Sequence, residues 1–64
     1  MKLVRLTPEN VKNYIGYKII FTSRGKILIK DIISTSVSGK CIKIEHQDLN
    51  NCLQIVSRNV YVSV

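Results

Sequence analysis

The feature that most constrains this chain is the stretch Tyr17–Thr35, which reads YKIIFTSRGKILIKDIIST. It contains two apolar runs rich in β-branched residues, and a short polar segment that ends in Gly25 separates them. Two such runs around a turn glycine are typical of a β-hairpin. We therefore predict a pair of antiparallel strands in this stretch.

The register of the hairpin depends on its loop. A three-residue loop of Ser23, Arg24 and Gly25, with Gly25 in the left-handed conformation, places Thr22 opposite Lys26. Counting outward gives one purely apolar face, which we expect in the core, and a second face on which lysine alternates with aliphatic residues. The first face pairs Phe21 with Ile27 and Ile19 with Ile29; the second pairs Ile20 with Leu28 and Lys18 with Lys30.

The remaining segments carry further turn, helix and strand signals. Thr7 can cap a helix and Pro8 suits its first position, so we predict a two-turn helix over about Pro8 to Ile15, closed by Gly16. The consecutive Ile32 and Ile33 suggest that the second hairpin strand bends or changes partners there. Further strands are expected at Met1–Leu6, Cys41–His46 (with Ile42 and Ile44 inward), Cys52–Val56 and Val60–Val64, the last two separate or one strand with a bulge, and a single helical turn at Asp48–Asn51 with Leu49 against the core.

These elements predict the fold class. With 64 residues the chain has room for a single domain, residues 1–64, and its hydrophobic fraction of 45% is ordinary for a folded protein. An open sheet of this size leaves its second face and both edges uncovered. We therefore predict a mainly β domain, namely a closed or nearly closed five-stranded barrel with one short N-terminal helix.

This layout resembles the SH3-like small barrels, which include Tudor-type and KOW-type nucleic-acid or chromatin modules. The resemblance covers most of the chain and rests on the early hairpin, the short turns and the one-turn element at Asp48–Asn51. A helix followed by a barrel also resembles the Sm-like proteins, but no Sm signature is present, so ring assembly and uridine binding are not carried over. A Tudor-type cage needs clustered aromatic residues, and the sequence has only Tyr14, Tyr17, Phe21 and Tyr61.

The lysine-bearing face of the hairpin is the candidate nucleic-acid site. Ten Lys and Arg against four Asp and Glu give a net charge of +6, which suits a polyanion or an acidic protein surface, or serves solubility alone. Lys18 and Lys30 repel each other when they lie opposite, and an anion between them relieves the repulsion. The predicted nucleic-acid contacts are Lys18, Arg24, Lys26 and Lys30, supported by Lys43 and Arg58, with Tyr17 stacking on a base.

Two alternatives to this site stay open. A two-residue loop of Arg24 and Gly25 places Lys18 opposite Asp31, in a surface ion pair of little consequence, and weakens the case for an anion site. A lysine-decorated strand that only deters edge aggregation is the other alternative.

A second functional hypothesis is a protein-interaction or assembly module. Ile20, Leu28 and Ile32 share the lysine-bearing face in the three-residue register, and three large aliphatic side chains there need a cover. The N-terminal segment, a partner protein or a second copy of the chain can supply it. The small size and a composition suggestive of an AT-rich genome also suit a viral or phage accessory protein.

Catalytic, metal and cofactor sites are not predicted, and we do not expect an enzyme. Cys41, His46, Asp48 and Cys52 are the only mixed ligand cluster, and their spacing matches no common zinc module. Two free thiols are expected, one or both in the core, with a disulfide only if the cysteines meet on neighbouring strands. The sequence has neither a signal-peptide block nor a membrane-spanning stretch, so we expect an intracellular protein without a membrane partner.

Overall fold

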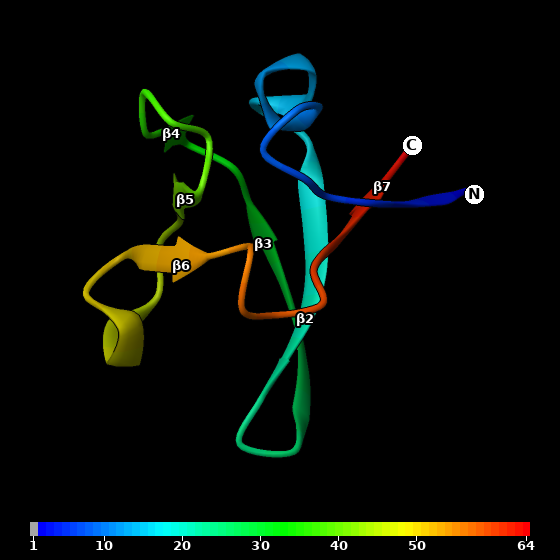
Figure 1. Ribbon diagram of the computed structural model, residues 1–64. Coiled ribbons are helices and arrows are strands. Elements are labelled where there is room, and N and C mark those ends of the chain that lie inside the picture. The colour runs from blue at the N-terminus through cyan, green and yellow to red at the C-terminus, as the bar shows by residue number, and fades with distance from the viewer. Residues whose placement is uncertain (1) are drawn as a thin grey trace.

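The computed structural model describes residues 2–64 and folds them into two antiparallel sheets (Figure 1). Sheet A has four strands in the order β1-β7-β2-β3, and sheet B has three in the order β4-β5-β6. The mainly β prediction is confirmed, whereas the five strands and the closed barrel are wrong. The strands are β1 (Leu3–Arg5), β2 (Lys18–Ser23), β3 (Lys26–Asp31), β4 (Ser34–Thr35), β5 (Cys41–Lys43), β6 (Cys52–Gln54) and β7 (Tyr61–Ser63).

The chain passes from sheet A to sheet B at Ile32 and Ile33. The N–H of Ile32 still bonds to the carbonyl of Tyr17 at 3.0 Å, beside the β2–β3 pair, whereas the N–H of Ile33 bonds to the carbonyl of Lys43 at 2.8 Å. The predicted change of partners is thus confirmed. Because the chain changes partners here, the second sheet covers the inner face of the first, and no barrel closure is needed to bury a core.

The core lies between the two sheets and is entirely apolar within residues 2–64. Strand alternation supplies most of it: Ile42 and Ile44 are buried while Lys43 and Glu45 are exposed, as predicted. The buried side chains are Leu6, Val11, Ile19, Phe21, Ile32, Ile42, Ile44, Leu53, Ile55, Val60 and Val62.

The predicted two-turn helix is wrong, because the segment forms only the 3-10 helix η1 (Val11–Tyr14) after a turn. The side-chain oxygen of Asn10 accepts the Thr7 N–H at 2.8 Å, and its amide donates to the carbonyl of Arg5 at 3.0 Å. Such bonds between an Asn side chain and the nearby backbone compete with α-helical hydrogen bonds. An isolated helix of two turns is in any case only marginally stable in water.

The remaining predictions concern the helical turn, the last two strands and the two cysteines in the C-terminal half. The expected helical turn is the 3-10 helix η2 (Gln47–Leu49), and Leu49 packs against the core. Strands β6 and β7 belong to different sheets, so they are two strands and not one with a bulge. Both cysteines are free, but Cys41 is only half-buried and Cys52 is exposed, so the expectation of a core thiol is wrong. Of the predicted N-terminal strand, Met1 lies outside the described residues.

Candidate functional site

The turn between β2 and β3 has two residues, Arg24 and Gly25. Their φ angles of 53° and 75° are both positive, as a type I′ turn requires, and Ser23 lies opposite Lys26. The expected three-residue loop is therefore wrong, and the two-residue alternative is observed. Type I′ turns match the right-handed twist of the flanking strands, which offsets the cost of a left-handed arginine.

The register changes which residues share a face of the hairpin. A shift of one residue moves every side chain of β3 to the other face relative to β2. Ile20 now lies opposite Ile29, and Phe21 lies opposite Leu28. Ile27 and Ile29, which were expected in the core, are instead 72% and 59% exposed.

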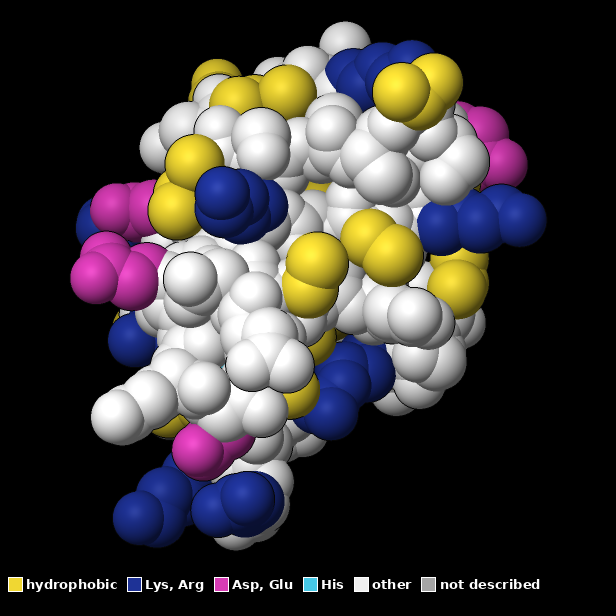
Figure 2. Space-filling view, turned by 90° about the vertical axis from the view of Figure 1, so that its left-hand side faces the viewer, with side chains coloured by type: hydrophobic (Ala, Val, Ile, Leu, Met, Phe, Trp, Pro, Cys, Tyr) yellow, Lys and Arg dark blue, Asp and Glu magenta, His cyan; other side chains and the backbone are white. Residues whose placement is uncertain are grey.

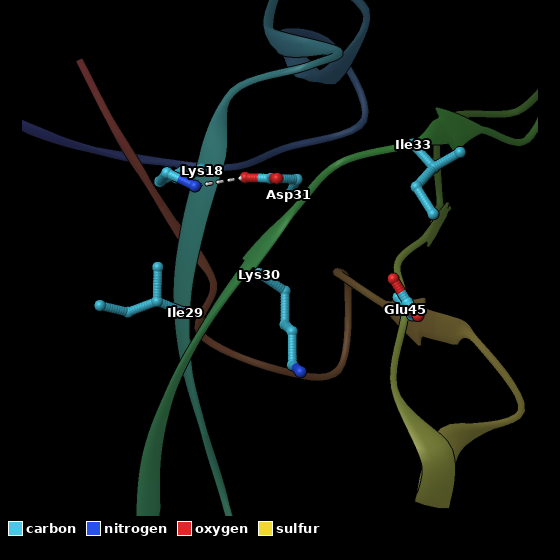
Figure 3. A pocket seen from close by; sticks show the side chains of 6 residues that line it. All are labelled: Lys18, Ile29, Lys30, Asp31, Ile33 and Glu45. Carbon is cyan, nitrogen blue, oxygen red and sulfur yellow. Dashed lines mark hydrogen bonds and ion pairs between the residues drawn. The ribbon is translucent and has the colours of Figure 1, made fainter.

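Lys18 lies opposite Asp31 and not opposite Lys30 (Figure 3). The Lys18 Nζ and the Asp31 Oδ1 are 2.9 Å apart, and both side chains are largely exposed to solvent. Exposed pairs of this kind contribute at most about 1 kcal/mol to stability. The predicted repulsion between two lysines is absent, so no bound anion is needed to relieve it.

The hairpin cations of the predicted nucleic-acid site do not form one surface. Lys30 is half-buried on the inner face of β3, opposite Ile19, whereas Lys18 lies on the outer face. The Arg24 Nη1 lies 3.6 Å from the Asp48 Oδ2 of η2. Only Lys26 shares a face with Lys30. The hairpin therefore presents no single cationic face.

The supporting residues are also separated from one another. Lys43 is exposed on sheet B, and Arg58 donates through Nη1 to the carbonyl of Thr22 at 3.3 Å. The exposed Tyr17 packs edge-on against Tyr14, with ring centroids 5.4 Å apart. Figure 2 shows the sheet B side of the molecule, where two Lys or Arg side chains lie side by side at the lower end and the others are spread among hydrophobic, acidic and uncharged ones.

The predicted interface trio does not share a face either. Ile32 is 2% exposed and belongs to the core, and Leu28 packs against that core from the inner face of β3. Only Ile20 lies on the outer face, where it is half-buried. The prediction that these three residues form one exposed apolar surface is therefore wrong.

A different apolar surface covers the outer face of sheet A. The strand pairing aligns Arg5, Tyr61, Ile20 and Ile29 in one row across all four strands. Leu3 and Ile27 lie two residues from Arg5 and Ile29, so strand alternation places them on the same face. No described element covers Ile27, Ile29 or Leu3, which is 50% exposed. The outer patch is Leu3, Ile20, Ile27, Ile29 and Tyr61.

Strand β3 is an edge of sheet A, because among residues 2–64 it pairs with β2 alone. In a hairpin with a two-residue turn, the flanking residues Ser23 and Lys26 form a hydrogen-bonded pair, and every second pair repeats it. The backbone groups of Ile27, Ile29 and Asp31 therefore point away from β2. Within residues 2–64 these groups make no backbone bond to another segment.

A small hollow lies beside this edge (Figure 3). Its volume is about 240 Å³, below the range of about 300–1,000 Å³ that is usual for ligand pockets. Ile29 and Lys30 leave β3 in opposite directions, as Figure 3 shows, so the hollow wraps around the strand edge. Its lining residues are Lys18, Ile29, Lys30, Asp31, Ile33 and Glu45.

The mixed ligand cluster considered from the sequence is not assembled. Within residues 2–64, no group of three or more His, Cys, Asp or Glu side chains lies close enough to hold a metal ion. His46 instead accepts the Asp48 N–H through Nδ1 at 3.2 Å, at the start of η2. Cys41 and Cys52 lie on neighbouring strands, but they face Gln54 and Lys43 and not each other. Nor is any helix among residues 2–64 long and apolar enough to cross a bilayer.

Comparison of the chain with protein-family models, curated proteins and solved structures found no significant match. The resemblance to SH3-like barrels therefore stays a prediction. The outer patch is therefore defined by the strand pairing and the exposure of its residues, and not by similarity to a known protein.

Sequence reasoning missed most of the outer patch. The three-residue loop predicts Ile27 and Ile29 in the core. The available signal was charge: the two-residue loop places Lys18 opposite Asp31, whereas the longer loop opposes two lysines. Leu3 and Tyr61 were not singled out, and only strand alternation in the short β1 and β7 marks them as outward.

Proposed function

We propose that this chain is a non-enzymatic protein-interaction module that docks a partner through the outer patch. The observation that carries the proposal is the exposure of Ile27 and Ile29 beside Ile20 and Tyr61 on one sheet face. Contiguous exposed apolar side chains commonly mark interaction sites, because their contact with water is unfavourable. Polar or charged neighbours rim the patch at Arg5, Lys18 and Asp31, as at many interfaces.

The small hollow supports a binding role over catalysis. It is small, and its charged groups are two lysines, an aspartate that already pairs with Lys18, and a glutamate. A catalytic site needs convergent groups with a nucleophile or base held by a third residue. The lining residues offer no such arrangement, so the proposal includes no reaction.

Partner retention by matched surface variants tests this function. Ile29→Asp places a charge in the outer patch, and Val37→Asp makes the same kind of change at a 95% exposed residue outside it. We expect a partner from the protein's own source cells to bind the wild-type chain and Val37→Asp, and to be lost with Ile29→Asp. Circular dichroism and thermal unfolding establish that both variants fold.

Two results contradict the proposal. One is a partner that binds Ile29→Asp as well as it binds Val37→Asp, and the other is a wild-type chain that retains no partner. Sedimentation of the purified chain tests whether the partner is a second copy. In that case Ile29→Asp shifts an oligomer to monomer and Val37→Asp does not.

Nucleic-acid binding is the second candidate function. Of the ten Lys and Arg residues, only Lys18 and Arg24 form ion pairs within residues 2–64, so eight positive charges have no acidic partner there. Dispersed cations favour weak binding to phosphates without sequence preference. Filter binding to DNA and RNA at low and moderate salt tests it. Affinity that falls steeply with salt supports it, and no affinity at low salt excludes it.

A further inference from the structure

We propose that the free edge of β3 binds an extended acidic peptide as an additional strand of sheet A. This inference rests on the proposed function and names the partner of the outer patch: an extended segment with an acidic residue, three apolar residues and a second acidic residue. Its recognition elements are the outward backbone groups of β3 and the sequence Lys26-Ile27-Leu28-Ile29-Lys30.

The backbone of β3 is available for pairing along three alternate residues. Ile27, Ile29 and Asp31 direct their N–H and C=O groups away from β2, and no described segment bonds to them. Unpaired edge groups in this arrangement are a template for another strand. The exposed side chains of Ile27 and Ile29 add apolar contact at the same residues.

The side chains of β3 fix the composition of the peptide. Successive residues of an added strand lie on alternate faces, next to the β3 residues opposite them. Residues opposite Ile27 and Ile29 extend the outer patch and are apolar. A residue opposite Leu28 lies against the core side and is also apolar. Residues opposite Lys26 and Lys30 are acidic.

The charges around β3 favour an acidic occupant. Neither Lys26 nor Lys30 makes an ion pair within residues 2–64. Glu45 lines the hollow beside Lys30, so we expect Lys26 to contribute more of the attraction. The pattern from Lys26 to Lys30 reads the same in both directions, so one peptide pattern suits a parallel or an antiparallel strand.

The same charges disfavour a second copy of the chain in the register that is centred on Leu28. Centring β3 on β3 of a second copy places Leu28 opposite Leu28 and brings each Lys26 opposite a Lys30. Like charges directly opposite each other destabilise a strand pair. The net charge of +6 adds repulsion between two copies.

The probe is an acetylated synthetic peptide, Ser-Glu-Val-Leu-Val-Glu-Ser, titrated into the full chain and followed by NMR. We expect amide shifts concentrated in β3, with slowed hydrogen exchange at Ile27 and Ile29. The amides of Leu28 and Lys30 already bond to β2, so we expect their exchange to change little. For an antiparallel peptide, methylating the two valine nitrogens removes the bonds to β3 and methylating the leucine nitrogen spares them. For a parallel peptide the leucine nitrogen makes such a bond and the valine nitrogens do not, so the outcome is reversed; equal binding by both methylated peptides contradicts strand addition.

Charge reversal tests the acidic part of the pattern. We expect Lys26→Glu with Lys30→Glu to weaken binding about tenfold and a peptide with both glutamates replaced by lysine to restore it. Lys12→Glu with Lys40→Glu is the control, because both residues are exposed, lie outside β3 and give the same net charge. Equal weakening in both double variants means non-specific attraction and overturns the proposal.

Ile29→Pro tests the backbone part, because it removes an N–H that the fold does not use. We expect a folded variant that does not bind the peptide. If it fails to fold, the two methylated peptides decide the same point on the wild-type chain. No peptide binding, together with partner retention lost only by Ile29→Asp, overturns strand addition and leaves the outer patch in place. If retention is also insensitive to Ile29→Asp, the proposed function fails with it.

Discussion

Strands β2 and β3 are the two halves of one hairpin, with similar apolar content and opposite exposure. In β2, Ile19 and Phe21 are 0% and 2% exposed, whereas the large aliphatic residues Ile27 and Ile29 of β3 remain in water. The difference is position, because β2 pairs with β7 and β3 whereas β3 pairs with β2 alone. The aliphatic composition of a strand alone therefore does not place its residues in the core. Register and strand order decide which of its residues are buried.

The largest test of this contrast is the same substitution in each strand. We expect Ile19→Ala to lower the free energy of unfolding by about 2–5 kcal/mol, because it leaves a cavity in the core. Ile29→Ala removes little buried surface, and we expect a loss within about 1 kcal/mol. Urea denaturation measures both. Equal losses mean that β3 is as buried as β2 in solution.

The second test compares proline at two cross-strand neighbours. Ile20 and Ile29 lie opposite each other, but the backbone groups of Ile20 point toward Tyr61 of β7, whereas those of Ile29 point to the free edge. Ile20→Pro removes a ladder bond and leaves a carbonyl without a partner, which costs about 1–3 kcal/mol. We expect a smaller loss for Ile29→Pro in thermal unfolding. The reverse order contradicts β3 as an edge strand.

The third test strengthens the turn that holds β3 in the sheet. Arg24 has a φ of 53°, which is unfavourable for a side chain of this type, and Asn-Gly is the preferred pair for a type I′ turn. We expect Arg24→Asn to stabilise the chain by about 0.5–1 kcal/mol, measured by urea denaturation. Destabilisation instead indicates that the ion pair with Asp48 outweighs the turn conformation.

The smallest effect concerns the ion pair that joins the two strands. We expect a double-mutant cycle of Lys18→Ala and Asp31→Ala to give a coupling of about 0.2–1 kcal/mol, because both side chains are exposed. The coupling falls as salt is added. A larger coupling that resists salt contradicts the solvated geometry of this pair.

The sequence was informative where alternation was strict and local. It placed Ile19 and Phe21, and Ile42 and Ile44, in the core, and it located the change of partners at Ile32 and Ile33. It did not decide the register, because the loop length depends on whether Arg24 takes a left-handed φ. That single angle determined the side on which Ile27, Ile29 and the other residues of β3 lie relative to β2.

The errors outside the hairpin also have physical causes. Thr7 and Pro8 are favourable residues for the start of a helix, but no α-helix follows them. The Asn10 side chain bonds to the backbone of Thr7 and Arg5 and competes with α-helical hydrogen bonds. The barrel was inferred because an open sheet leaves its faces uncovered. The seven short strands of residues 2–64 satisfy this need differently: sheet B covers one face of sheet A, and the outer patch stays exposed. The barrel prediction therefore missed the exposed outer face of sheet A.

The register of the hairpin is tested most directly by NMR contacts between backbone Hα protons. In the observed register, Ile20 with Ile29 and Thr22 with Ile27 are pairs without mutual hydrogen bonds, whose Cα atoms lie only about 4.5 Å apart. We expect strong nuclear Overhauser effects between the Hα protons of these pairs. Strong effects between Ile19 and Ile29 and between Phe21 and Ile27 would instead return Ile27 and Ile29 to the core face and remove the outer patch.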